Sequence, residues 1–96
     1  MKIVTICGSM RFQKEMIKVA EELESKNGYC VLQPVYNSGG NFLSEDALTR
    51  LAKAHYKKID LSDAIFVVNV GGYIGQSTTE EIRYAEKHGK EIMYLE

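Results

Sequence analysis

The chain has few residues of the kinds that mark several protein classes. Its 96 residues include two cysteines, Cys7 and Cys30, and two histidines. Two cysteines are too few for a disulfide framework, and no cysteine and histidine have the close spacing of a zinc site. The formal net charge is -1, and no block of like charge suggests a nucleic-acid partner or a membrane surface. No apolar run approaches the roughly 20 residues of a membrane span. We therefore expect reduced thiols, a cytoplasmic location and no metal site.

What the chain does contain is a regular alternation of apolar runs and amphipathic segments. Hydrophobic residues make up 45% of it, enough to fold, and the length fits a single domain over residues 1–96. The patterns predict an N-cap at Ser44 and a loop over residues 35–43. The predicted strands cover residues 2–7, 29–33, 64–70 and 91–95, and the predicted helices cover residues 11–25, 45–59 and 79–88.

This order of elements predicts a class of fold. Strands separated by helices indicate a parallel sheet with helices on both faces. Right-handed crossovers then favour an α/β, doubly wound, flavodoxin- or Rossmann-like sheet of four strands in the order 2-1-3-4. Ligands bind such sheets beyond the carboxyl ends of the strands, at the point where the strand order reverses. The loops that meet there are residues 8–12 and 69–78, and we expect them to form one site.

The first of these loops has the residues of an anion site. Gly8 permits a tight turn, Ser9 can cap the next helix, and Arg11 can bind a phosphate through two hydrogen bonds. The plainer interpretation makes them a turn, a cap and a solvated surface residue. Cys7 precedes them at the strand end, where a small buried thiol is commoner than a nucleophile. We count Cys7, Gly8, Ser9 and Arg11 among the candidate ligand-binding residues, although G-x-G-x-x-G and P-loop patterns are absent.

The second loop is rich in glycine and leads into a helix. Backbone N–H groups at such a junction suit a phosphate. The candidate binding residues here are Gly72, Gly75, Ser77 and Thr78.

Two glutamates follow in the first turn of that helix. Ser77-x-x-Glu80 and Thr78-x-x-Glu81 both fit a capping box. Helical phase turns Glu80 toward solvent and Glu81 toward the sheet. We therefore predict that Ser77 is the N-cap, that Glu80 closes the box, and that Glu81 faces the ligand and acts in catalysis.

His55 lies on the apolar stripe of the second helix, with Leu48, Leu51 and Ile59. A histidine in that position is more often packed and hydrogen-bonded than catalytic, although its ordinary pKa lies close to neutrality. Both interpretations stay open at this point.

Three segments together resemble the nucleoside 2-deoxyribosyltransferase-like superfamily, which includes deoxynucleoside 5′-monophosphate N-glycosidases and short phage or bacterial relatives. They are residues 6–11, residues 62–68, and residues 75–90. The family places its nucleophilic glutamate four residues before a helical alanine and closes that helix with Gly-Lys. Here Glu81 precedes Ala85 by four, and Gly89-Lys90 follows.

The resemblance implies cleavage or transfer of the N-glycosidic bond of a nucleoside or a nucleoside 5′-monophosphate, without a metal or cofactor. Glu81 would be the nucleophile, and Gly8, Ser9 and Arg11 would contact the phosphate. His55 stands where family enzymes commonly have an aspartate, eight residues before Asp63, and would protonate the leaving base. The alternatives are a non-catalytic nucleotide-binding module and an oligomeric scaffold whose glutamates are only caps. A homodimer is expected because so small a sheet gains from burying a helix face.

Overall fold

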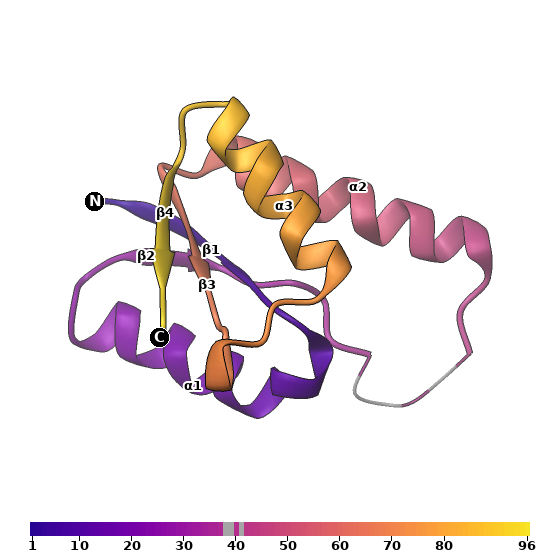
Figure 1. The fold of residues 1–96 in the computed structure, drawn as a ribbon, viewed down its shortest axis with the longest axis horizontal. Coiled ribbons are helices and arrows are strands. Elements are labelled where there is room, and N and C mark those ends of the chain that lie inside the picture. Colours follow the sequence, from indigo (N-terminus) through magenta and orange to yellow (C-terminus); the bar gives the residue numbers. More distant parts are fainter. Residues whose placement is uncertain (38–39, 41) are drawn as a thin grey trace.

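The computed structural model describes residues 1–37, 40 and 42–96, and at its centre is a parallel sheet with the strand order β2-β1-β3-β4 (Figure 1). The predicted order is therefore confirmed. The strands are β1 (Ile3–Cys7), β2 (Cys30–Leu32), β3 (Ala64–Val67) and β4 (Glu91–Tyr94). The helices are α1 (Gln13–Ser25), α2 (Glu45–Leu61) and α3 (Gln76–Lys87), with single 3₁₀ turns η1 (Met10–Phe12) and η2 (Val70–Gly72).

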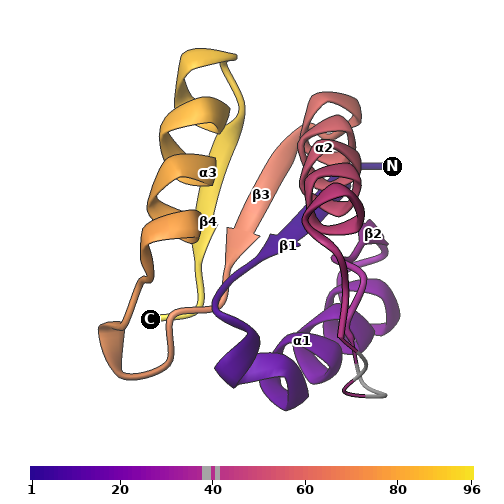
Figure 2. The same cartoon turned by 90° about the vertical axis from the view of Figure 1, so that its right-hand side faces the viewer.

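Helices cover both faces of the sheet, as predicted. Side chains alternate along a strand, so Val4 and Ile6 of β1 pack with Met16 of α1. The other face packs against α2 and α3, where Cys7 lies in a buried cluster with Ile59 and Ala85. Figures 1 and 2 show α1 on one side of the strands and the other two helices on the opposite side. The sheet is thus doubly wound.

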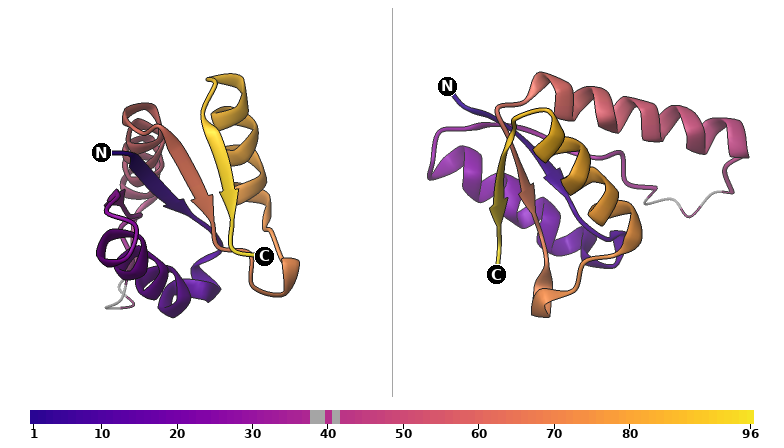
Figure 3. Two further views of the ribbon diagram at one scale, coloured as in Figure 1. Left: turned by 90° about the vertical axis from the view of Figure 1, so that its left-hand side faces the viewer. Right: turned by 45° about the horizontal axis from the view of Figure 1, so that its top comes forward.

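Helix α2 extends past the end of the sheet. Its amino-terminal half projects beyond the strands in Figure 1 and in the right-hand view of Figure 3. Among the residues of α2, all of which are described, Ile59 alone is buried. Leu48, predicted to lie on a packed stripe, is 53% exposed because no strand lies beneath it. The predicted cap is confirmed: the Ser44 hydroxyl accepts a hydrogen bond from the Ala47 N–H at 3.1 Å.

Several boundaries differ from the prediction. Strand β3 ends at Val67, three residues early, because the chain turns there into η2. Helix α3 begins at Gln76 and α2 continues to Leu61. Within the predicted loop over 35–43, residues 38, 39 and 41 lie outside the described residues, and the others form neither helix nor strand. No helix in the described part of the chain has the length and apolar character to cross a membrane.

Asn69 joins the glycine loop to the end of the last strand. Its side-chain amide donates to the Glu96 carbonyl at 3.1 Å, and its oxygen accepts from the Glu96 N–H at 2.9 Å. The Glu96 carboxylate in turn accepts from the Gly71 N–H at 3.1 Å. Because Asn69 is buried, these contacts fix the loop between β3 and α3 against the end of β4.

We expect Asn69→Ala to lower the free energy of unfolding by about 1–3 kcal/mol, because it removes two hydrogen bonds at a buried position. Urea unfolding followed by circular dichroism measures the change. Asn27→Ala, at an exposed position after α1, is the matched control. Equal free energies for the two variants would contradict this role of Asn69.

Candidate active site

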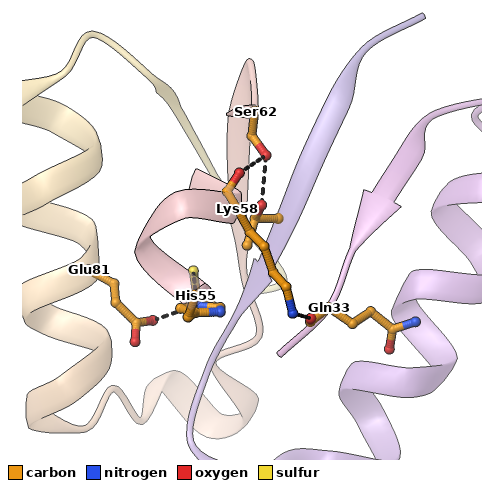
Figure 4. A network of polar contacts seen from close by, with 7 residues as sticks. Gln33, His55, Lys58, Ser62 and Glu81 are labelled. Atoms are coloured by element: carbon orange, nitrogen blue, oxygen red, sulfur yellow. Dashed lines mark hydrogen bonds and ion pairs between the residues drawn. The ribbon is translucent and has the colours of Figure 1, made fainter. Parts of the chain in front are cut away.

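Three polar side chains from three elements meet at the carboxyl end of β1. They are Cys7, the last residue of β1, His55 on α2 and Glu81 on α3. His55 Nε2 lies 3.5 Å from Cys7 Sγ and 3.4 Å from Glu81 Oε1, and Figure 4 shows the imidazole facing the carboxylate. Cys7 is buried, and the side chains of His55 and Glu81 are 11% and 16% exposed. We call these three residues the reactive cluster.

A pocket of about 370 Å³ opens beside the reactive cluster. That volume suits a small ligand. Both His55 and Glu81 line it, together with Gly8 from the first loop and Ser77 from the start of α3. The rest of the lining is apolar and comprises Met10, Pro34, Val35, Leu48, Leu51 and Ala52. The pocket therefore combines an apolar wall with two titratable side chains.

Gly8, which follows β1, lies beside Val68, which follows β3. A Cβ on this residue would lie 3.0 Å from the Val68 carbonyl oxygen and 3.4 Å from Met16 Sδ. Contacts that short require the backbone to shift, so the absence of a side chain lets the first loop pass beside the end of β3. Close packing against Val68 therefore explains why this position holds a glycine.

Other residues singled out in the sequence lie outside the pocket lining. Thr78 is buried, and Gly72 forms part of η2. The Ser9 hydroxyl accepts a hydrogen bond from the Arg11 N–H at 3.3 Å and so caps η1. The Arg11 guanidinium stacks on the Tyr73 ring, with its central carbon 4.0 Å from the ring centroid. This contact joins the two loops that the sequence predicted to meet.

The predicted cap of α3 is wrong. Gly75 occupies the N-cap with an extended backbone and no side-chain hydrogen bond, and its carbonyl accepts from the Thr79 hydroxyl at 2.9 Å. Ser77 therefore belongs to the first turn, and Glu80 closes no capping box with it. A glycine can end the loop and start the helix through its backbone alone, which allows the helix to begin two residues before Thr78.

The predicted directions of the Glu80 and Glu81 side chains around the helix do not depend on that cap. Successive helical residues are rotated by a fixed angle wherever the helix begins. Glu80 is exposed, whereas Glu81 lines the pocket.

Electrostatics separate the roles within the reactive cluster. Burial raises the pKa of the Cys7 thiol well above its usual 9.0, and the negative charge and hydrogen bond of Glu81 raise it further. The thiol therefore keeps its proton, and Cys7 is poorly suited to nucleophilic attack. Nδ1 of His55 is buried without a hydrogen-bond partner among the described residues. A buried polar atom of this kind is a place for a water molecule or a ligand atom to bind.

The raised pKa of Cys7 predicts a pH dependence of stability. The folded protein binds this proton more tightly than the unfolded chain does, so the stabilisation is complete below the unfolded pKa and is lost as pH rises through the folded pKa. We expect the free energy of unfolding to fall as the pH rises above about 9.0, the ordinary thiol pKa, and to fall less in Cys7→Ala. Urea titrations across this range measure it.

The comparison with Cys7→Ala is needed because Tyr36, Tyr56 and Tyr84 also have raised pKa values. Cys30→Ala, at the half-buried thiol, is the control and should keep the wild-type slope. A slope identical in all three proteins would contradict the assignment.

Beside the reactive cluster, a row of polar contacts holds α2 on the sheet. The Lys58 ammonium donates to the Gln33 carbonyl at 2.6 Å. The Ser62 hydroxyl donates to the Lys58 carbonyl at 2.8 Å and is hydrogen-bonded to the buried Thr5 hydroxyl at 2.6 Å (Figure 4). These contacts position His55, one turn earlier on the same helix. Sequence reasoning missed them, although the spacing of His55 and Lys58 places both on one helical face. Ser62 follows the helix as its C-cap.

The doubly wound sheet hosts many unrelated activities, so the function has to be argued from the side chains at the site. These side chains are a carboxylate and an imidazole in contact, at the wall of a pocket with a mainly apolar lining. In comparisons with known proteins, no family model matches the chain and no curated protein matches it.

Proposed function

We propose that the protein cleaves or transfers the N-glycosidic bond of a nucleoside or a nucleoside 5′-monophosphate, with Glu81 as the nucleophile. The observation that carries this proposal is the placement of Glu81, whose carboxylate lines the pocket and contacts His55 at 3.4 Å. The resemblance of the segment around Glu81, Ala85 and Gly89 to the nucleoside 2-deoxyribosyltransferase-like superfamily supports the same role.

The reaction needs one nucleophile and one acid. A Glu81 oxygen forms a bond to C1′ as the bond from C1′ to the base nitrogen breaks, through an oxocarbenium-like transition state. The electron pair of the broken bond goes to the base, and His55 supplies a proton to that nitrogen. Water or a second base then attacks C1′, gives a proton to His55 and releases Glu81, so the configuration at C1′ is retained. No cofactor takes part.

Other residues in the pocket, and Arg11 outside its lining, suit the remaining parts of such a substrate. The apolar wall formed by Met10, Pro34 and Leu51 can pack against a base. The N–H groups at the start of α3, near Ser77, can hold a phosphate. Arg11 has no ion pair with a carboxylate among the described residues, so its guanidinium can bind the same group.

The test is release of free base from a panel of ribonucleosides, deoxyribonucleosides and their 5′-monophosphates, separated by chromatography. We expect release from at least one member, with transfer detected when a second base is added. Absence of release from every member would contradict the proposed reaction.

A second candidate is a nucleotide-binding module without chemistry. The residue at position 55 favours it, because His55 stands where enzymes of the resembled superfamily commonly have an aspartate. Calorimetric binding of a nucleotide together with no base release over long incubation would select this candidate.

We also propose that the protein is a cytoplasmic homodimer. Its free cysteines suit a reducing compartment. Leu48, 53% exposed, and Phe42, 96% exposed, give the projecting part of α2 and its approach an apolar surface that a second copy can cover.

Leu48→Glu should weaken this dimer, because it places a charge in an apolar contact. Sedimentation equilibrium measures the change in dissociation constant. Leu61→Glu, at an exposed position on the opposite end of α2, is the control. A monomeric wild-type protein, or equal effects of the two variants, would argue against this dimer.

A further inference from the structure

The reactive cluster consists of three different metal-ligand types. Cys7 offers a sulfur, His55 a ring nitrogen and Glu81 a carboxylate oxygen, and these atoms all lie within 4.8 Å of one another. A sulfur and an imidazole together favour zinc over magnesium or calcium, which prefer oxygen ligands only. Each ligand comes from a different element, β1, α2 or α3, and the elements are packed together, so the atoms are already held close.

The distances fit a tetrahedral ion. Zinc binds sulfur at about 2.3 Å and nitrogen or oxygen at about 2.0 Å, so tetrahedral ligand atoms are separated by roughly 3.3–3.6 Å. The separation of Sγ and Nε2 is 3.5 Å, and that of Nε2 and Oε1 is 3.4 Å. Two of the three separations therefore already match those around a tetrahedral ion, and the third, between Sγ and the Glu81 carboxylate, is within 4.8 Å.

Charge and access also fit. A thiolate and a carboxylate together neutralise a divalent cation, so the partly buried cluster would carry no net charge. Because His55 and Glu81 line the pocket, a fourth coordination position would open into it. His55 Nδ1 has no partner among the described residues, and a ligating histidine without such support typically binds metal about 10–100-fold more weakly. These features describe an exchangeable ion.

We propose that Cys7, His55 and Glu81 form an exchangeable zinc site, and that zinc inhibits the enzyme by binding the Glu81 carboxylate. On binding, the Cys7 thiol releases its proton to solvent and the sulfur lone pair forms the bond to zinc. The carboxylate lone pair needed for attack on C1′ forms a second bond to the ion. The site itself stands on the geometry of the reactive cluster, whereas the inhibition rests on the proposed function.

Cobalt(II) titration tests the site independently of activity. We expect a thiolate-to-cobalt charge-transfer band and d–d bands of tetrahedral intensity, saturating at one ion per chain and abolished by added zinc. Cys7→Ser should remove the charge-transfer band, and Glu81→Gln or His55→Gln should weaken cobalt binding by tenfold or more, about the smallest loss typical of a lost metal contact.

The controls are Cys30→Ser and His88→Gln, which alter the other thiol and the other imidazole and should leave the spectra unchanged. Absence of the charge-transfer band in the wild-type protein would overturn the site, whatever the variants do. A band that survives Cys7→Ser and disappears in Cys30→Ser would overturn it as well.

Inhibition is tested by base release with and without zinc. We expect zinc to stop release and a chelator to restore it. Release that continues in zinc-saturated protein, with saturation shown by loss of the cobalt spectrum, would overturn the inhibitory role. A wild-type protein that releases no base under any condition contradicts the proposed function alone, because the cobalt spectra still decide whether the metal site exists.

Discussion

Glu81→Gln is expected to lower kcat for base release by about 10³-fold or more, the scale of loss when a covalent nucleophile is removed. Glutamine keeps the size of the side chain and its place at the pocket wall, but an amide oxygen is a much poorer nucleophile than a carboxylate. Single-turnover assays with purified protein measure the change. Calorimetry should show that the variant still binds substrate, since the other pocket residues are unaltered.

Glu80→Gln is the matched control for this experiment. It removes the same charge one residue earlier on α3, at a position that is exposed to solvent. Its kcat should stay within about twofold of wild type, because a solvent-exposed charge contributes little at a distance. Full activity in Glu81→Gln, or an equal loss in both variants, would mean that Glu81 is not the nucleophile.

The largest loss of stability is expected from Ile59→Ala, about 2–5 kcal/mol. Ile59 is fully buried and packs in the cluster that contains Cys7, Ile65 and Ala85. It is the buried residue of α2, so removing its side chain leaves a cavity beneath that helix. Small domains have only about 5–15 kcal/mol of stability in total, and urea unfolding will show a loss of this size clearly.

The control is Leu61→Ala on the same helix, at an exposed position, which should change stability by no more than about 0.5 kcal/mol. Because His55 is one turn from Ile59, base release by folded Ile59→Ala should also be slower than wild type. Equal stability losses in the two variants would show that α2 is held mainly by its polar contacts with Gln33 and Thr5.

Much of the fold could be predicted because its signals are local. The apolar run over residues 64–70 predicts a central strand, and the structure has that strand over Ala64–Val67. The spacing of Phe12, Met16, Val19, Ala20 and Leu23 predicts a helix, and the last four of these residues are buried on α1. Gly28 and Gly89 adopt positive φ angles just after α1 and α3. Helix α1 ends at Ser25 as predicted, and α3 ends at Lys87, one residue before its predicted end. The projection of α2 was not predictable, because the length of sheet beneath a helix is set by strands elsewhere in the chain.

The site was predictable only in part. Helical phase distinguished Glu81 from Glu80, since it depends on one helix alone. The contact between Cys7 and His55 joins residues 48 apart in sequence and depends on how α2 crosses the sheet. The N-cap of α3 was mispredicted because a serine hydroxyl and a glycine backbone can each begin a helix. In the structure the glycine loop leads into the helix at Gly75, two residues before Ser77.

The parallel connections have a consequence for how the protein folds. The Ile3 N–H donates to the Asp63 carboxylate, 60 residues away, and β1 pairs with β3 from that point. Joining such distant segments requires the closure of a long loop, and topologies dominated by such contacts fold more slowly than those with local contacts. Glu81 comes later in the chain than both of these strands, on α3, the last helix in sequence. A fragment that ends before α3 therefore contains Cys7 and His55 but lacks the carboxylate of the reactive cluster.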